Sequence, residues 1–284
     1  MRAHGPFRGR RTLACLVGTM VLAFASFAAA QFGQLGQFGQ LGRGGRVQAT
    51  IAPLTFPDGN FAVCRLVYTE VRRYGQGWRT DYPLGERNLS VRVGELTKTR
   101  VSQRGGEPNH YLVRLTDPQL FSCPFLMAGD VGSMGISATD AVQLREYLLK
   151  GGFLWTDDHW GSEEWEVWTR ELAKVFDPRE FPIEEVTPAD PIFQSQFVMS
   201  AMPQIPNIGF WRRGGGTSEQ GADSAVPHFK AVRDRQGRIM LAMTHNTDIA
   251  DAFEREGDDP EFFAQFAPNG YALGINVVLY ALTH

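Results

Sequence analysis

The sequence lacks the short motifs that mark several common kinds of active site. It contains no Gly-x-Ser-x-Gly nucleophile elbow, and no His-x-x-x-His or His-Glu-x-x-His spacing for a metal ion. The glycine-rich stretch at 214–217 has neither the preceding strand nor the Lys-Ser/Thr ending of a phosphate-binding loop. These absences argue against a serine hydrolase with a nucleophile elbow, a zinc protease and a P-loop nucleotide-binding protein.

Charged residues are also unevenly placed. No acidic residue precedes Asp58, and no block rich in lysine and arginine follows the first 30 residues. The whole chain has 28 basic and 31 acidic residues, and four of the arginines lie in the first 30. Without those four the balance is 24 to 31, a net charge near −7, which argues against non-specific binding to nucleic acid or to an anionic membrane.

The first 30 residues have the pattern of a signal peptide. A start with four arginines is followed by an apolar run from residue 13 to residue 30, which ends in three alanines. The run is interrupted by Gly18, Thr19 and Ser26, and falls short of the roughly 20 strongly apolar residues of a membrane-spanning helix. We therefore predict cleavage after residues 1–30, export to the periplasm or the medium, and no stable transmembrane span afterwards. A retained anchor is the alternative. Arg10 and Arg11 leave the twin-arginine route open beside the general one.

A short repeat separates this segment from the rest of the chain. The six residues Gln-Phe-Gly-Gln-Leu-Gly occur twice in succession from residue 31, and a Gly/Arg stretch follows them. Such a composition cannot bury enough apolar surface to offset its ordering entropy. The sequence predicts a flexible linker over residues 31–58 and a single α/β domain over residues 59–284.

Only two cysteines, Cys64 and Cys123, lie beyond the predicted signal peptide. An exported location permits a disulfide between them. Both cysteines lie in apolar, strand-like stretches, where a free cysteine behaves as a small buried hydrophobe. Their spacing leaves the two alternatives open.

Strand and helix patterns alternate beyond residue 58. β-prone apolar stretches predict strands at 61–68, 111–115, 124–128 and 152–155. Helical periodicity predicts helices at 88–96, 138–150, 162–177 and 270–282, and a hairpin is expected at 229–243. Ser137 is expected to cap the second helix. Short connections between such elements predict an α/β fold with a mostly parallel sheet and helices on both faces.

Polar side chains follow three of the predicted strands. Ligands of open α/β sheets bind outside the carboxyl ends of the strands, so these residues are the candidate site. They are Asp130, Asp157, Asp158, His159, His245, Asn246 and Asp248. Each carboxylate also has a structural interpretation: Asp130 as a turn cap, Asp157 and Asp158 as acceptors for the loop before the 162–177 helix, and Asp248 as a helix cap.

Two kinds of chemistry suit this set of residues. Carboxylates with histidine can hold calcium or magnesium, and paired carboxylates can hydrolyse a glycoside. No metal-binding spacing occurs, so we assign no metal and no cofactor. Among the tryptophans, Trp165 and Trp168 have core spacing, whereas Trp160 and Trp211 are better placed for an exposed sugar platform; packing is the main expectation for all four.

Five segments, spread in order along the chain, resemble a known family. They are residues 78–83 (Trp-Arg-Thr-Asp-Tyr-Pro), 144–158 (Leu-Arg-Glu-Tyr-Leu-Leu-Lys-Gly-Gly-Phe-Leu-Trp-Thr-Asp-Asp), 190–193 (Asp-Pro-Ile-Phe), 245–248 (His-Asn-Thr-Asp) and 274–281 (Gly-Ile-Asn-Val-Val-Leu-Tyr-Ala). Together they resemble the bacterial family called domain of unknown function 4159, over about residues 59–284.

The resemblance implies a flavodoxin-like sheet, related to the class I glutamine amidotransferase-like fold and to the ThuA-like proteins. In amidotransferases a nucleophilic cysteine follows the strand that corresponds to residues 152–155. Here that turn reads Thr156-Asp157-Asp158-His159, so amidotransferase activity is not expected. The family name implies no activity of its own.

The main functional hypothesis is therefore an exported domain that binds a small polar or carbohydrate-like ligand at the carboxyl ends of its strands, without catalysis. One alternative is a glycan-directed hydrolase that uses the Asp157/Asp158 region. The other is a non-catalytic assembly partner in the cell envelope.

Overall fold

The computed structural model describes residues 50–72, 75–214 and 216–284. The predicted signal peptide and most of the predicted linker lie outside these ranges, so the division of the chain at residues 30 and 58 stays a prediction. The described chain is already paired at its start, where Ile51 forms a bridge with Leu112. In the described part of the chain no helix combines the length and the apolar character needed to cross a bilayer.

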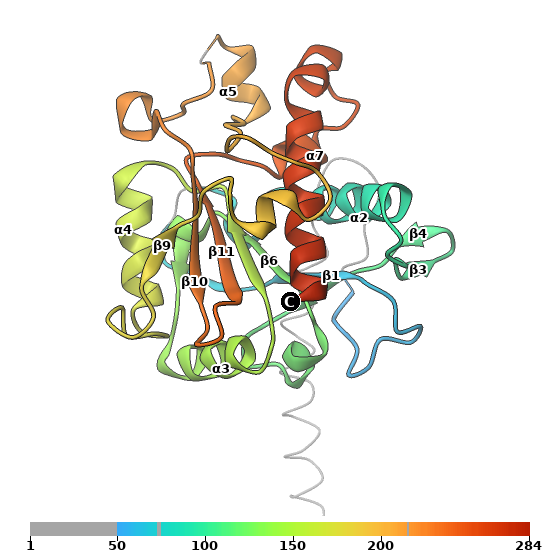
Figure 1. The fold of residues 1–284 in the computed structure, drawn as a ribbon, viewed down its shortest axis with the longest axis vertical. Helices are drawn as coiled ribbons and strands as arrows, with labels where there is room; N and C mark the ends of the chain where they lie inside the picture. Colours follow the sequence, from blue (N-terminus) through green and yellow to red (C-terminus); the bar gives the residue numbers. More distant parts are fainter. Residues whose placement is uncertain (1–49, 73–74, 215) are drawn as a thin grey trace, which may run out of the picture. The chain divides into compact units, whose positions relative to one another are not determined.

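A seven-stranded sheet organises the domain, in the order β5-β1-β6-β8-β11-β10-β9 (Figure 1). Its strands are β1 Val63–Leu66, β5 His110–Val113, β6 Leu126–Gly129, β8 Leu154–Asp157, β9 Ile183–Glu185, β10 His228–Arg233 and β11 Ile239–His245. The first five in this order are parallel, and β10 and β9 add an antiparallel edge. Numbered along the chain, the parallel strands run 2-1-3-4-5, the flavodoxin-like order. The predicted fold class is confirmed.

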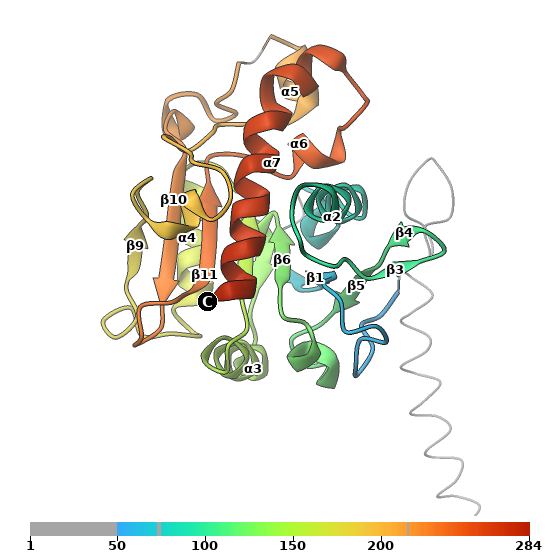
Figure 2. The ribbon, with the colours of Figure 1, turned by 45° about the vertical axis from the view of Figure 1, so that its right-hand side comes forward.

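The central strands are apolar because helices cover both faces of the sheet. Every residue of β6, β8 and β11 is buried, as expected for parallel strands between two helical layers. Helices α2 Leu84–Leu96, α6 Asp251–Glu254 and α7 Pro260–Thr283 gather on one side of the strands (Figure 2). On the other side lie α3 Ala138–Leu149 and α4 Gly161–Leu172, whose Trp168 contacts Met243 of β11.

The remaining elements are short. They are the strands β2 Thr69–Glu70, β3 Gln103–Arg104, β4 Glu107–Pro108 and β7 Met134–Gly135, the helix α5 Ile208–Arg212, and the 3₁₀ turns η2 Gly77–Arg79, η3 Pro118–Ser122, η4 Val131–Ser133, η5 Pro191–Gln194 and η6 Gly221–Ser224.

Local signals account for where the helices begin. Ser137 and Asp140 form a reciprocal capping box at the start of α3, which confirms the predicted cap. The last helix begins ten residues before its predicted start at residue 270, so that boundary was wrong. Asp259 accepts hydrogen bonds from two backbone N–H groups, and Pro260 occupies the first turn, where its missing N–H costs nothing.

Two buried interactions tie β1 to its surroundings. Cys64 of β1 and Cys123, which precedes β6, form a disulfide with an S–S distance of 2.02 Å, so the alternative of two free buried thiols is wrong. The next residue, Arg65, forms a fully buried ion pair with Glu86 of α2. The disulfide joins neighbouring strands and the ion pair holds α2 against the sheet.

We expect replacement of both Cys64 and Cys123 by alanine to lower the free energy of unfolding by up to about 4 kcal/mol. The disulfide closes a loop between residues 59 apart, and its loss returns that loop entropy to the unfolded chain. Urea denaturation of the wild type and the double variant measures the difference. Two titratable thiols in the native, non-reduced protein would contradict the disulfide.

Candidate functional site

The parallel strands deliver their polar residues to one edge of the sheet. Asp130 follows β6, Asp157 ends β8 and is followed by Asp158, and Asp248 lies three residues beyond β11. The strand order changes direction at β1, between β5 and β6, which is where flavodoxin-like folds bind ligands. We refer to the edge of the sheet where the parallel strands end as the carboxyl edge.

Asp157 has a structural role at this edge. Its side chain is fully buried and accepts hydrogen bonds from the hydroxyl of Thr244 in β11 and from the backbone N–H of Ala250, at 2.8 Å in the second case. The bonds are to β11 and to the chain after it, not to the loop that enters α4 as the sequence suggested. Burial raises the pKa of Asp157 to about 6, against the opposing effect of these hydrogen bonds.

Asp158 and Asp248 meet a third carboxylate, Asp81, which the sequence analysis did not select. One carboxylate oxygen of each residue lies within 4.8 Å of the others. The three come from the turn before α2, the end of β8 and the segment before α6. We call them the carboxylate cluster. The only sequence signal for Asp81 was its place in the 78–83 motif. The search for polar residues at strand ends missed it because no strand ends directly before it.

Each member of the carboxylate cluster has a different set of partners. Asp158 is partly exposed and accepts hydrogen bonds from the indole N–H of Trp160 at 3.0 Å and the hydroxyl of Thr80 at 3.3 Å. Asp248 is buried and accepts one from the backbone N–H of Asp251 at 2.9 Å, close to its predicted capping role. Asp81 is 5% exposed, and its Oδ2 accepts no hydrogen bond.

The end of β6 is shaped to admit the turn that carries Asp81. A Cβ on Gly129 would lie 2.3 Å from the side chain of Thr80, closer than real contacts allow. Glycine therefore lets the turn approach the sheet. Asp81 itself has a left-handed backbone, with φ of 60°, and so does Asp158, with φ of 54°. Aspartate tolerates this conformation better than most residues.

Burial and mutual repulsion act on the carboxylate cluster in the same direction. Burial raises the pKa of Asp81 well above its usual range, and Asp158 raises it further, while Arg65 opposes the shift. The pKa of Asp248 is raised by burial and then by Asp81 and Asp158. Burial likewise raises the pKa of Asp158, followed by Asp130. The site therefore favours a bound proton or positive charge, either of which neutralises its negative charge.

A second acidic group adjoins the first through Asp81, whose carboxylate also lies close to those of Asp251 and Glu254. Arg255 lies beside this second group and forms ion pairs with Asp251 at 3.2 Å and with Glu254 at 2.8 Å. Asp81 itself forms no such pair among the described residues. Arg255, which follows α6, is thus engaged by acidic residues of that helix.

The two histidines lie beside the carboxylate cluster in an aromatic stack. The ring of His245 lies 5.1 Å from that of His159 and 4.9 Å from that of Trp165. Nε2 of His245 is 3.0 Å from the carbonyl of Gly161, and both ring nitrogens of His159 are buried without a hydrogen-bond partner. Burial lowers the pKa of His245 to about 4 and that of His159 well below its usual range, so both rings are neutral at pH 7.

Asn246 and Asp130 mainly hold the backbone. Asn246 accepts a hydrogen bond from the N–H of Gly161 and donates one to the carbonyl of Val226, which joins three segments. The carboxylate of Asp130 accepts a hydrogen bond from the N–H of Gly77 at 2.8 Å, and burial raises its pKa to about 6.

Both tryptophans proposed for a sugar platform take part in packing. Trp160 is buried and directs its indole N–H to Asp158. Trp211 belongs to α5 and packs edge-on against Phe262 of α7, 5.5 Å between ring centres. The packing role expected for both is confirmed.

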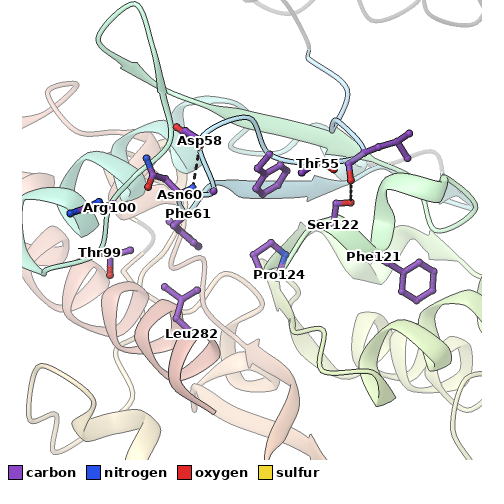
Figure 3. Close-up of a pocket in the computed structure, with 13 residues that line it drawn as sticks. Thr55, Asp58, Asn60, Phe61, Thr99, Arg100, Phe121, Ser122, Pro124 and Leu282 are labelled. Atoms are coloured by element: carbon purple, nitrogen blue, oxygen red, sulfur yellow. Dashed lines mark hydrogen bonds between the residues drawn. The ribbon is translucent and has the colours of Figure 1, made fainter.

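A separate surface groove lies beside Phe61, which precedes β1, and Leu282 near the end of α7 (Figure 3). Its volume of about 810 Å³ would suit a small molecule. Two of its polar groups are already engaged: Asp58 accepts the N–H of Asn60, and Ser122 donates to the carbonyl of Leu54. The groove contains no buried carboxylate or imidazole, so we place the candidate site at the carboxyl edge.

We expect Asp157→Ala to lower the free energy of unfolding by about 1–3 kcal/mol, because the buried N–H of Ala250 loses its acceptor. Urea denaturation measures this loss. The neighbouring variant Asp158→Ala is the matched control and should cost less. Equal losses at the two positions would contradict the structural role that we assign to Asp157 and not to Asp158.

Asp158→Asn should stabilise the metal-free protein at pH 8. The folded-state pKa of Asp158 is raised above its unfolded value, so its ionised form costs stability above the folded pKa. That cost, and with it the gain from asparagine, should vanish as the pH falls to about 4, near the unfolded pKa. Thermal unfolding of both proteins between pH 4 and pH 8, in the presence of a chelator, tests the trend. A variant that is less stable than the wild type at pH 8 would contradict it.

Comparisons with known proteins bear on the whole domain. A search of curated proteins finds no match to the chain. The family model of a domain of unknown function (DUF4159) matches residues 63–282, which include the sheet from β1 to β11 and all members of the carboxylate cluster. The resemblance drawn from the five sequence segments is thereby confirmed, and the chain belongs to the DUF4159 family.

Proposed function

We propose that this domain binds a small, hydroxyl-rich polar ligand of the carbohydrate type at its carboxyl edge, and that it does not hydrolyse it. The observation that carries the proposal is the meeting of Asp81, Asp158 and Asp248 at the carboxyl ends of parallel strands. Carboxylate oxygens accept hydrogen bonds from hydroxyl groups, and such charge-assisted bonds are about twice as strong as neutral ones.

The position of Asp158 supports access by a ligand. It is the partly exposed member of the carboxylate cluster, whereas Asp81 and Asp248 lie behind it and are 5% and 2% exposed. A hydroxyl group that reaches Asp158 would also find carboxylate oxygens within 4.8 Å. The surrounding fold holds Asp81 and Asp158 in left-handed backbone conformations, so both residues are positioned before a ligand arrives.

The arrangement favours binding over glycoside hydrolysis. The hydrolase alternative needs two carboxylates about 5 Å or more apart, one as acid and one as nucleophile or base. Asp157, which was to be one of them, is engaged with Thr244 and Ala250.

Export belongs to the proposal as well. The signal-peptide pattern lies outside the described residues. The buried disulfide between Cys64 and Cys123 supports an oxidising compartment, because structural disulfides are rare in the cytosol. The ligand would then be one that the protein meets outside the cytoplasm.

A thermal-shift screen of the purified protein against neutral monosaccharides, disaccharides and polyols tests the function. A ligand at about 100 times its dissociation constant should stabilise the fold by roughly 2.7 kcal/mol. Asp158→Asn should abolish the shift, whereas Asp177→Asn, which alters an exposed aspartate paired with Arg179, should keep it. A shift that survives Asp158→Asn would place the ligand elsewhere. The absence of any shift, together with recovery of one reproducible envelope protein, would favour the assembly alternative.

A further inference from the structure

Three buried or partly buried carboxylates meet with no cation among them. Asp81, Asp158 and Asp248 form no ion pair with any described residue. The two arginines nearby in the fold have other partners: Arg65 is paired with Glu86, and Arg255 with the acidic residues of α6. Carboxylates brought this close repel one another unless a proton or a cation lies between them.

Asp81 supplies a second and independent sign of a missing partner. The residue is 5% exposed, and its buried Oδ2 accepts no hydrogen bond, whereas buried polar atoms in proteins are nearly always paired. The same carboxylate lies within 4.8 Å of oxygens on both Asp158 and Asp248. The Asp81 carboxylate thus lies close to two other acids while one of its own oxygens has no hydrogen-bond partner.

The geometry points to a binding site for a hard divalent cation, calcium or magnesium, formed by Asp81, Asp158 and Asp248. Oxygen-only ligands select such ions, and two oxygens bound to one calcium ion can lie about 5 Å apart, given bonds of 2.3–2.6 Å. The observed limit of 4.8 Å is within the span of one calcium ion for each pair of oxygens, whereas magnesium, with bonds of about 2.0–2.1 Å, would need the three oxygens to draw closer. The site uses the same three residues as the proposed ligand site, and in its position it rests on that proposal.

A cation here would also give the proposed ligand its chemistry. Hard cations keep part of their coordination shell for water or for hydroxyl oxygens of a ligand. Asp158, the partly exposed member, lies on the side from which such a ligand would arrive. Diols and polyols would then bind through the ion, whereas Asp81 and Asp248 hold it from within.

Trp160 provides a direct probe of the site. Its indole N–H donates to Asp158 at 3.0 Å, so a terbium ion bound to Asp158 would lie close enough to the indole to be sensitised by tryptophan excitation. The experiment titrates terbium into the chelator-stripped protein, and then calcium or magnesium as competitor. We expect saturable sensitised emission that one of the two physiological ions displaces.

Asp81→Asn should weaken terbium binding by at least about 100-fold, as the loss of a ligand exceeds the 10–100-fold cost of losing a supporting partner. Asp248→Asn serves as the second variant, and Asp177→Asn, on the exposed surface, should bind as the wild type does. Circular dichroism and the melting temperature check that each variant is folded. Wild-type protein without saturable emission, emission that neither calcium nor magnesium displaces, or equal binding by folded Asp81→Asn would each overturn the site.

The metal titration contains no sugar, so it is independent of the proposed ligand. A cation that binds while no polar ligand shifts the melting temperature would refute the proposed function and keep the metal site. A sugar-induced shift that persists in excess chelator, with no terbium binding, would refute the metal site and keep the function.

Discussion

The buried carboxylate of Asp157 is the interaction on which the arrangement of the carboxyl edge depends. It accepts hydrogen bonds from Thr244 in β11 and from the N–H of Ala250, and so joins the end of β8 to the segment that follows β11. Asp158 is the next residue of the first segment, and Asp248 lies two residues before Ala250 in the second. Asp158 and Asp248 approach each other because Asp157 holds their two segments together. Its own role is structural, although it is fully buried.

Asp81, the third acid, is positioned at the same edge by other contacts. The ion pair of Arg65 with Glu86 anchors α2 against β1, and Gly129 leaves room for the turn that precedes this helix. Asp81 is carried on that turn in a left-handed conformation. Such backbone persists only where the surroundings hold it, and it is common at ligand sites. The sheet, the ion pair that holds α2 and the turn before α2 thus form the carboxyl edge together, before any ligand is present.

Much of this could be predicted from residue patterns. Apolar strands and capped helices in alternation gave the parallel sheet, and the rule that ligands bind beyond the strand ends selected Asp158 and Asp248. Asp81 was missed because it follows a 3₁₀ turn and no strand, and nothing local distinguishes it from a turn residue. The absence of a metal-binding spacing was also a weak guide to a cation site. The three acids come from separate segments of the chain, so no short motif contains them.

The sequence by itself determined the fold class and the set of polar residues near the strand ends, because hydrophobic periodicity and strand-end position are local properties. The family followed from the resemblance of five sequence segments. Only the tertiary structure decided which of those residues are partners of the backbone and which face one another. Asp157 and Asp158 are adjacent and chemically identical, yet one is engaged by β11 and the other faces Asp81 and Asp248. The same holds for Cys64 and Cys123, whose pairing required that β1 and β6 be neighbours. Contacts between distant segments depend on packing, which no local pattern records.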